Sequence, residues 1–199
     1  MKKILLASSN PGKLRELRTL LAPLEITLVR QSDLGVSDAA ETGGTFVENA
    51  ILKARHAAAA SGLPAIADDS GLVVDHLGGA PGIYSARYAG EGASDQANLH
   101  RLLDGLAGVP ESGRGARFKC LMVYMGHAGD PTPVIAEGTW EGRILLAPQG
   151  ENGFGYDPVF HVPTHGCSSA ELPPHVKNAL SHRGRAVREL IERLSRQGL

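Results

Sequence analysis

Two adjacent carboxylates, Asp68 and Asp69, are the residues of this sequence with the clearest chemical potential. They follow a continuous apolar run, residues 64–67, which predicts a short buried strand. Carboxylates that emerge from a buried strand need a paired cation or a bound metal, and oxygen ligands of this kind suit Mg²⁺. The alternative is an ordinary polar turn at 70–71 between this strand and a second strand-like run at 72–74.

A second stretch has the composition of a phosphate-binding loop. It lies between a predicted strand, residues 3–7, and a helical pattern over residues 14–21, and it consists of Ser8, Ser9, Asn10, Pro11, Gly12 and Lys13. Such a layout offers free backbone amides and the positive end of a helix to an anion, while the lysine adds charge and the serines add donors. The pattern is not the eight-residue P-loop, so an ordinary capped helix start remains the alternative.

A predicted helix over residues 45–60 carries the next candidates. Thr45 and Glu48 have the spacing of a capping box, which marks the start of the helix, and Ser94 is predicted to cap another helix over residues 94–107. Lys53 and Asn49 are four residues apart and therefore share one face. Taken alone, Lys53 is typical of a solvated helix lysine, and Glu41 in the preceding polar loop is typical of a loop carboxylate.

The last third of the chain contains a further group of polar and aromatic residues. Glycines that permit close approach of a ligand flank two aromatic rings and a carboxylate in Phe154, Gly155, Tyr156 and Asp157. Lys177 follows a proline-broken segment, and His182 and Arg183 open the final predicted helix. Basic side chains at a helix start oppose the helix dipole unless an anion is near, and a plain basic helix start is the alternative.

Composition limits the classes of protein to which the chain can belong. Its 199 residues suit one domain, 1–199. Two paired strands are predicted at 134–136 and 140–146 around residues 137–139, and the antiparallel character of residues 110–147 marks a candidate smaller lobe. The chain has 20 basic and 21 acidic residues and therefore a net charge of −1. This balance argues against a protein that coats nucleic acid. The two cysteines lack metal-ligand spacing. The N-terminal apolar run, residues 4–7, is too short for a signal peptide or a membrane span, so a cytoplasmic protein is expected.

Six segments, taken together and in order, resemble the bacterial noncanonical purine nucleoside triphosphate pyrophosphatases, the dITP/XTP or inosine triphosphatase-like family. The resemblance runs from residue 4 to about residue 195, and the segments that carry it are 8–13 (SSNPGK), 41–54 (ETGGTFVENAILKA), 67–72 (ADDSGL), 82–88 (GIYSARY), 154–158 (FGYDP) and 181–186 (SHRGRA). It implies a mixed α/β fold: a long twisted sheet with flanking helices and two lobes around a central cleft. It also implies a homodimer.

The same resemblance implies an activity and a set of site residues. The activity is magnesium-dependent hydrolysis of noncanonical purine triphosphates (ITP, dITP, XTP) to the monophosphate and pyrophosphate, which cleanses the nucleotide pool. Residues 8–13 match the triphosphate cradle, and Lys53 matches a phosphate-facing lysine. Asp69 matches the catalytic carboxylate, and Asp69, Glu41 and Asp68 together match the metal ligands. The remaining matched nucleotide contacts are Ser70, Phe154, Gly155, Tyr156, Asp157, Lys177, His182 and Arg183.

Two departures and two alternative functions qualify this expectation. The family more often has glycine where this chain has Ser9, and acidic residues where this chain has Pro-Pro-His-Val at 173–176. The first departure affects the cradle and the second affects the position of Lys177. The alternatives are a nucleotide pyrophosphatase that does not select its base and a nucleotide-binding module that has lost hydrolysis.

Overall fold

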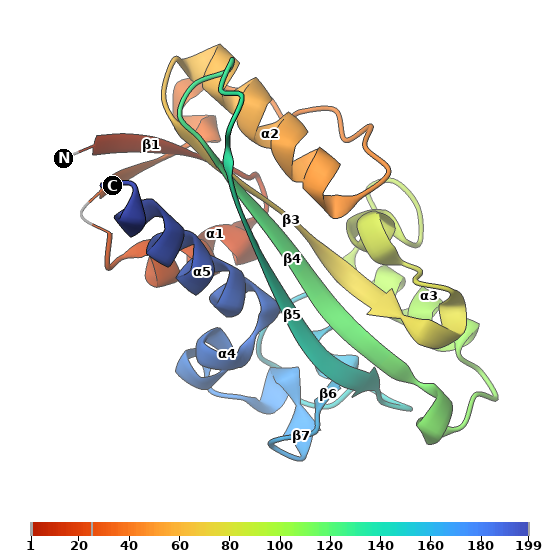
Figure 1. The fold of residues 1–199 in the computed structure, drawn as a ribbon. Coiled ribbons are helices and arrows are strands. Elements are labelled where there is room, and N and C mark those ends of the chain that lie inside the picture. The colour runs from red at the N-terminus through yellow and green to blue at the C-terminus, as the bar shows by residue number, and fades with distance from the viewer. Residues whose placement is uncertain (1, 25, 199) are drawn as a thin grey trace. The chain divides into compact units, whose positions relative to one another are not determined.

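A computed structural model describes residues 2–24 and 26–198, so that Met1, Glu25 and Leu199, within the predicted domain 1–199, lie outside the described residues (Figure 1). The described chain divides into two compact units. Unit 1 contains residues 1–69, 120–138 and 182–199, and unit 2 contains residues 70–119 and 139–181. Each unit has its own buried apolar core.

The described residues form a seven-stranded sheet of order β2-β1-β3-β4-β5-β6-β7. β1 pairs in parallel with β2 and β3, whereas β6 pairs antiparallel with β5 and β7. The strands are β1 (Lys2–Ala7), β2 (Ile26–Arg30), β3 (Ala65–Val74), β4 (Gly115–Met125), β5 (Val134–Ile144), β6 (Phe160–Val162) and β7 (Cys167–Ser168). A mixed sheet with flanking helices confirms the predicted mixed α/β class.

Side-chain caps begin three of the helices, two of them as the sequence predicts. Thr45 Oγ1 accepts from the Glu48 amide and Ser94 Oγ from the Ala97 amide, which satisfies amides that have no partner within a helix. Asn10 caps the first helix in the same way. The α-helices are α1 (Pro11–Leu21), α2 (Phe46–Ser61), α3 (Asp95–Gly105), α4 (Pro174–Leu180) and α5 (His182–Arg196).

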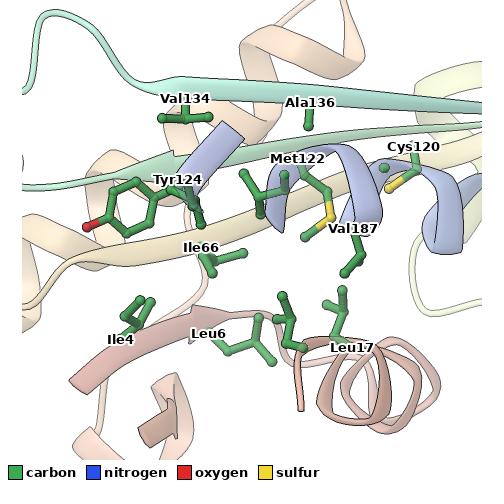
Figure 2. Close-up of a cluster of buried hydrophobic side chains, with 14 residues drawn as sticks. Ile4, Leu6, Leu17, Ile66, Cys120, Met122, Tyr124, Val134, Ala136 and Val187 are labelled. Carbon is green, nitrogen blue, oxygen red and sulfur yellow. The ribbon is translucent and has the colours of Figure 1, made fainter. Parts of the chain in front are cut away.

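In unit 1 the helices cover opposite faces of the sheet. Leu17 of α1 and Val187 of α5 pack with Ile66 of β3 in one buried cluster, in which side chains from the two helices and the strands point toward one another (Figure 2). Ala65 and Ala67 belong to a different buried cluster, which contains four alanines of α2. Because side chains alternate along a strand, neighbouring residues of β3 face different helices.

Two predicted breaks in strands are wrong. β3 continues without a turn at 70–71, since cations on both faces stabilise the carboxylates whose burial had favoured a turn. β5 is likewise one strand, not two strands around Gly138. A Cβ at Gly138 would lie 2.7 Å from the backbone nitrogen of Ala186, so this glycine admits the close approach of α5 and forms no turn.

The boundaries of the units also differ from the predicted lobe at 110–147. β4 and β5 are long strands whose residues belong partly to unit 1 and partly to unit 2, so the segment does not form a unit of its own. In unit 2 the core includes the packed rings of Phe118, Trp140 and Phe160. The centroid of the Phe160 ring lies 4.6 Å from that of Phe118 and 5.1 Å from that of Trp140. None of the described helices is long and apolar enough to cross a membrane.

Candidate active site

The alternation of β3 places the two central carboxylates among different partners in unit 1. Asp68 faces α1 and α5, as Ile66 does, and Asp69 faces α2, as Ala67 does. Both side chains are buried, with residue exposures of 2% and 5%. Adjacent residues of one strand therefore supply two separate charged clusters.

Asp68 lies in a cluster with Lys13 and Arg183. Its Oδ2 is 3.1 Å from Lys13 Nζ and 3.4 Å from the Nη2 of Arg183, whose other terminal nitrogen donates to Glu16. Burial alone would raise the pKa of Asp68, but the positive charges of Lys13, Arg183 and Lys53 hold it well below its usual range. Asp68 is therefore a permanent anion at neutral pH, suited to hold cations in place.

Asp69 lies in a second cluster with Lys53, Asn49 and Glu41. Lys53 Nζ is 2.7 Å from Asp69 Oδ1 and 3.0 Å from Glu41 Oε1, and Asn49 Nδ2 is 3.4 Å from Asp69 Oδ2. Burial raises the pKa of Asp69 above its ordinary value despite the opposing attraction of Lys53. Burial opposes the charge of Lys53, but attraction to Asp69, Asp68 and Glu41 outweighs it and raises the lysine pKa. Asp69 is thus the more basic of the two adjacent aspartates.

The predicted phosphate loop connects β1 to α1. The side-chain oxygen of Asn10, Oδ1, accepts from the backbone amide of Lys13 at 3.0 Å, and the backbone amide of Asn10 donates to Ser8 Oγ at 3.3 Å. Pro11 and Gly12 form the first turn of α1, and Ser9 is exposed. The loop therefore has the strand–loop–helix layout that the sequence predicts, and it presents Lys13 beside Asp68.

The donor set on the Asp69 side fits a divalent cation. Oxygens of Glu41 and Asp69 converge on one positive centre, Lys53 Nζ, so both can contact a single cation. Magnesium commonly takes one or two carboxylates together with water and substrate phosphates. No cluster of three or more histidine, cysteine or acidic side chains that could hold a metal is found among residues 2–24 and 26–198. The chain offers a partial site of the kind that a phosphate ligand completes.

Unit 2 holds another group of predicted residues around Asp157. Its carboxylate accepts from Lys177 Nζ at 2.6 Å, from the Phe154 amide at 2.9 Å and from Ser169 Oγ at 2.9 Å. Lys177 Nζ also lies 5.0 Å from the centroid of the Phe154 ring. An aromatic ring can stack on a planar heterocycle, and an ammonium group beside the ring can donate a hydrogen bond to that heterocycle.

The remaining predicted site residues lie in β3, in the segment 155–156 and at the start of α5. Ser70 belongs to β3, the Gly155 amide donates to Asp95, and the Tyr156 hydroxyl donates to the Ser85 carbonyl. His182 is the buried first residue of α5. The predicted set of site residues does not include Glu16, Asn49 and Ser169, which contact members of that set. Two of them had a signal: Glu16 lies one turn after Lys13 on α1, and Asn49 one turn before Lys53 on α2.

Fold and site together define a mixed α/β protein with buried lysine–carboxylate clusters on either side of its third strand. The sequence profile of the Ham1 family matches residues 4–193, and the chain belongs to that family. A Vibrio parahaemolyticus protein named dITP/XTP pyrophosphatase is 61% identical over 99% of this chain and 98% of its own. A similarly named Yersinia pseudotuberculosis protein is 60% identical over 98% of each chain.

Solved structures of similar proteins support the same family membership. A HAM1 protein from Coxiella burnetii is 50% identical with a TM-score of 0.91, covering 98% of this chain and 100% of its own. A structure from Mycobacterium abscessus, described as a nucleoside-triphosphatase or dITP/XTP pyrophosphatase, is 43% identical with a TM-score of 0.76. It covers 94% of this chain and 98% of its own. The recognition of the family from sequence is therefore confirmed.

Proposed function

We propose that this protein is a nucleoside triphosphate pyrophosphatase that hydrolyses noncanonical purine triphosphates, of the dITP and XTP type, to the monophosphate and pyrophosphate. Full-length relatives at about 60% identity with this name support the proposal. The observation that carries it is the convergence of Glu41 and Asp69 on Lys53 beside the Lys13–Asp68 pair. We expect this activity in the cytoplasm, because the nucleotide pool on which such an enzyme acts is found there. The homodimer remains a prediction.

The lysines would bind the triphosphate. Phosphoryl transfer depends mainly on positioning and on stabilisation of negative charge. The named side chains of unit 1 contribute three cations (Lys13, Lys53, Arg183) against four carboxylates (Glu16, Glu41, Asp68, Asp69), a sum of −1. A ligand with about four negative charges needs additional positive charge at such a site. This balance supports a dependence on Mg²⁺.

Glu41 and Asp69 would hold the magnesium ion, which when bound neutralises charge on the phosphate oxygens. Asp69, a carboxylate at the proposed metal site, would orient or deprotonate the attacking water. Asp68 would keep Lys13 and Arg183 in position from the other side of the strand. The predicted metal contact of Asp68 remains a prediction, since this carboxylate pairs with the cationic side chains of Lys13 and Arg183.

Selection of the base would rest on hydrogen bonding to the purine. Hypoxanthine and xanthine carry an oxygen at C6 where adenine carries an amino group, so buried donors at this position disfavour adenine. Phe154 would stack on the ring, with Lys177 beside it as a donor. Arg183, His182 and the backbone near Tyr156 are the further candidate donors. Guanine shares the C6 oxygen and would be rejected at its C2 amino group.

Measurement of pyrophosphate release tests the proposal. With Mg²⁺ present, the purified protein should release pyrophosphate from ITP, dITP and XTP, with a kcat/KM at least about 100-fold above that for ATP and GTP. Chelation of the metal should abolish the release. Equal rates on all purines would instead establish a pyrophosphatase that does not select its base. Binding without pyrophosphate release would establish a module that has lost hydrolysis.

Replacement of the phosphate-facing lysines tests the orientation of the nucleotide. Lys13→Ala and Lys53→Ala should each lower kcat/KM for all nucleoside triphosphates by a similar factor, because these side chains are proposed to contact phosphates and not the base. Loss of a hydrogen bond to a charged group, about 1.5–3 kcal/mol, corresponds to roughly 10- to 100-fold. The ranking ITP, XTP, ATP, GTP is the readout. A changed ranking would assign the replaced lysine to the purine.

A further inference from the structure

We infer that Asn49 is a positioning residue that holds both proposed metal-binding carboxylates, Asp69 directly and Glu41 through its loop. The inference rests on the proposed function and extends it to a residue outside the predicted site. Asn49 lies on α2 and is fully buried, one helical turn before Lys53. Buried amides are held in place by their hydrogen bonds, so the partners of Asn49 indicate what it organises.

The side-chain amide of Asn49 connects two segments that are distant in sequence. Its Oδ1 accepts from the Gly43 amide at 2.8 Å, and its Nδ2 lies 3.4 Å from Asp69 Oδ2. Only this orientation of the Asn49 side-chain amide satisfies both partners, since the Gly43 N–H requires an acceptor and an ionised carboxylate requires a donor. A rotation of the amide by 180° would place donor against donor and acceptor against acceptor.

The Asp69 contact complements that of Lys53. Lys53 Nζ donates to Asp69 Oδ1 and Asn49 Nδ2 donates to Asp69 Oδ2, so residues on one face of α2 position both oxygens of the carboxylate. The loop contact acts on the second carboxylate, because Gly43 is two residues from Glu41, whose Oε1 lies 3.0 Å from the same lysine. Asn49 thereby fixes the distance between the two carboxylates that would share a metal.

The glycine at position 43 supports this reading. A Cβ there would lie 2.8 Å from Asn49 Oδ1 and 2.6 Å from Glu48 Cβ, closer than such atoms approach in folded proteins. Its backbone angle φ is not positive, so the space beside Asn49, and not backbone strain, excludes a side chain. The loop therefore lies as close to Asn49 as a backbone can.

The test is the affinity of the protein for Mn²⁺ alone, measured by electron paramagnetic resonance of the free ion without nucleotide. Replacing groups that orient metal ligands typically costs about 10- to 100-fold in metal affinity. Asn49→Leu, which has similar volume, should weaken Mn²⁺ binding by that factor. It should raise the Mg²⁺ concentration at half-maximal rate equally, and leave the nucleotide KM at saturating metal unchanged. Gly43→Ala, at a partly exposed position, should act in the same direction if the leucine variant does not fold.

Asn98 provides a matched control. It is a buried asparagine of α3 that links two backbone groups, accepting from the Ala89 amide at 2.7 Å and donating to the Ala86 carbonyl at 3.1 Å. Asn98→Leu should lower the melting temperature without changing the Mn²⁺ dissociation constant. Unchanged Mn²⁺ affinity in Asn49→Leu or, if that variant does not fold, in Gly43→Ala would overturn the inference. Wild-type protein that binds no Mn²⁺ would also overturn it. If only pyrophosphate release failed, the proposed function would be wrong. The comparison of Mn²⁺ affinity between the wild type and the variants would still test the role of Asn49.

Discussion

Asp69→Asn should lower kcat by at least about 100-fold on every nucleoside triphosphate while the protein stays folded, because general-base catalysis typically contributes 10²- to 10⁴-fold. Asparagine has the size of aspartate but cannot accept the proton of the attacking water. Lys53 keeps its contact with Glu41, so the buried ammonium group retains a carboxylate partner. The measurement is kcat for ITP at saturating Mg²⁺, together with the melting temperature.

Asp68→Asn is the informative comparison for this prediction. Asp68 contacts Lys13 and Arg183 on the opposite face of β3, so its neutralisation should mainly lower stability and weaken nucleotide binding. The two adjacent aspartates should therefore differ in kind: the variant at position 69 should have a lower kcat, and the variant at position 68 should have a lower melting temperature and a higher KM. Near-normal kcat in Asp69→Asn would assign the base to Asp68 instead.

Arg183→Ala should destabilise the protein by about 3–5 kcal/mol, since removal of one partner leaves the others as uncompensated buried charges. Arg183 is 2% exposed and lies between Glu16 and Asp68. For a chain of this length, roughly 2–4 °C of melting temperature correspond to each kcal/mol, so a fall of roughly 10 °C is expected. Thermal unfolding followed by circular dichroism measures it.

A matched arginine of the same helix separates this effect from the loss of any positive charge. Arg193 forms an exposed pair with Glu189, and Arg193→Ala should change stability by less than about 1 kcal/mol. The proposed contact with the purine adds a second readout below the melting transition. ITP hydrolysis should fall more than residual ATP hydrolysis in Arg183→Ala, and equal losses would assign Arg183 to the phosphates. An unchanged melting temperature would contradict the stabilising role.

Much of the fold followed from local sequence. The caps at Thr45 and Ser94, and the strand–loop–helix around Lys13, depend on interactions between residues only three or four positions apart. Such interactions have the same geometry wherever a helix begins, so sequence spacing predicts them. The chemistry of the candidate residues was equally readable, because adjacent carboxylates and a glycine-flanked aromatic segment have few stable environments.

Other features depended on which distant segments meet. The alternation of β3 sends Asp68 and Asp69 to different helices, and only the tertiary structure brings Lys13 to one and Lys53 to the other. The same applies to Gly138, whose role against α5 is indistinguishable in sequence from that of a turn glycine. The charged partners of Asp68 and Asp69 lie 16 to 115 residues away in the sequence, from Lys53 for Asp69 to Arg183 for Asp68. Burial makes those partners necessary, but the sequence alone contains no local signal for which residues they are.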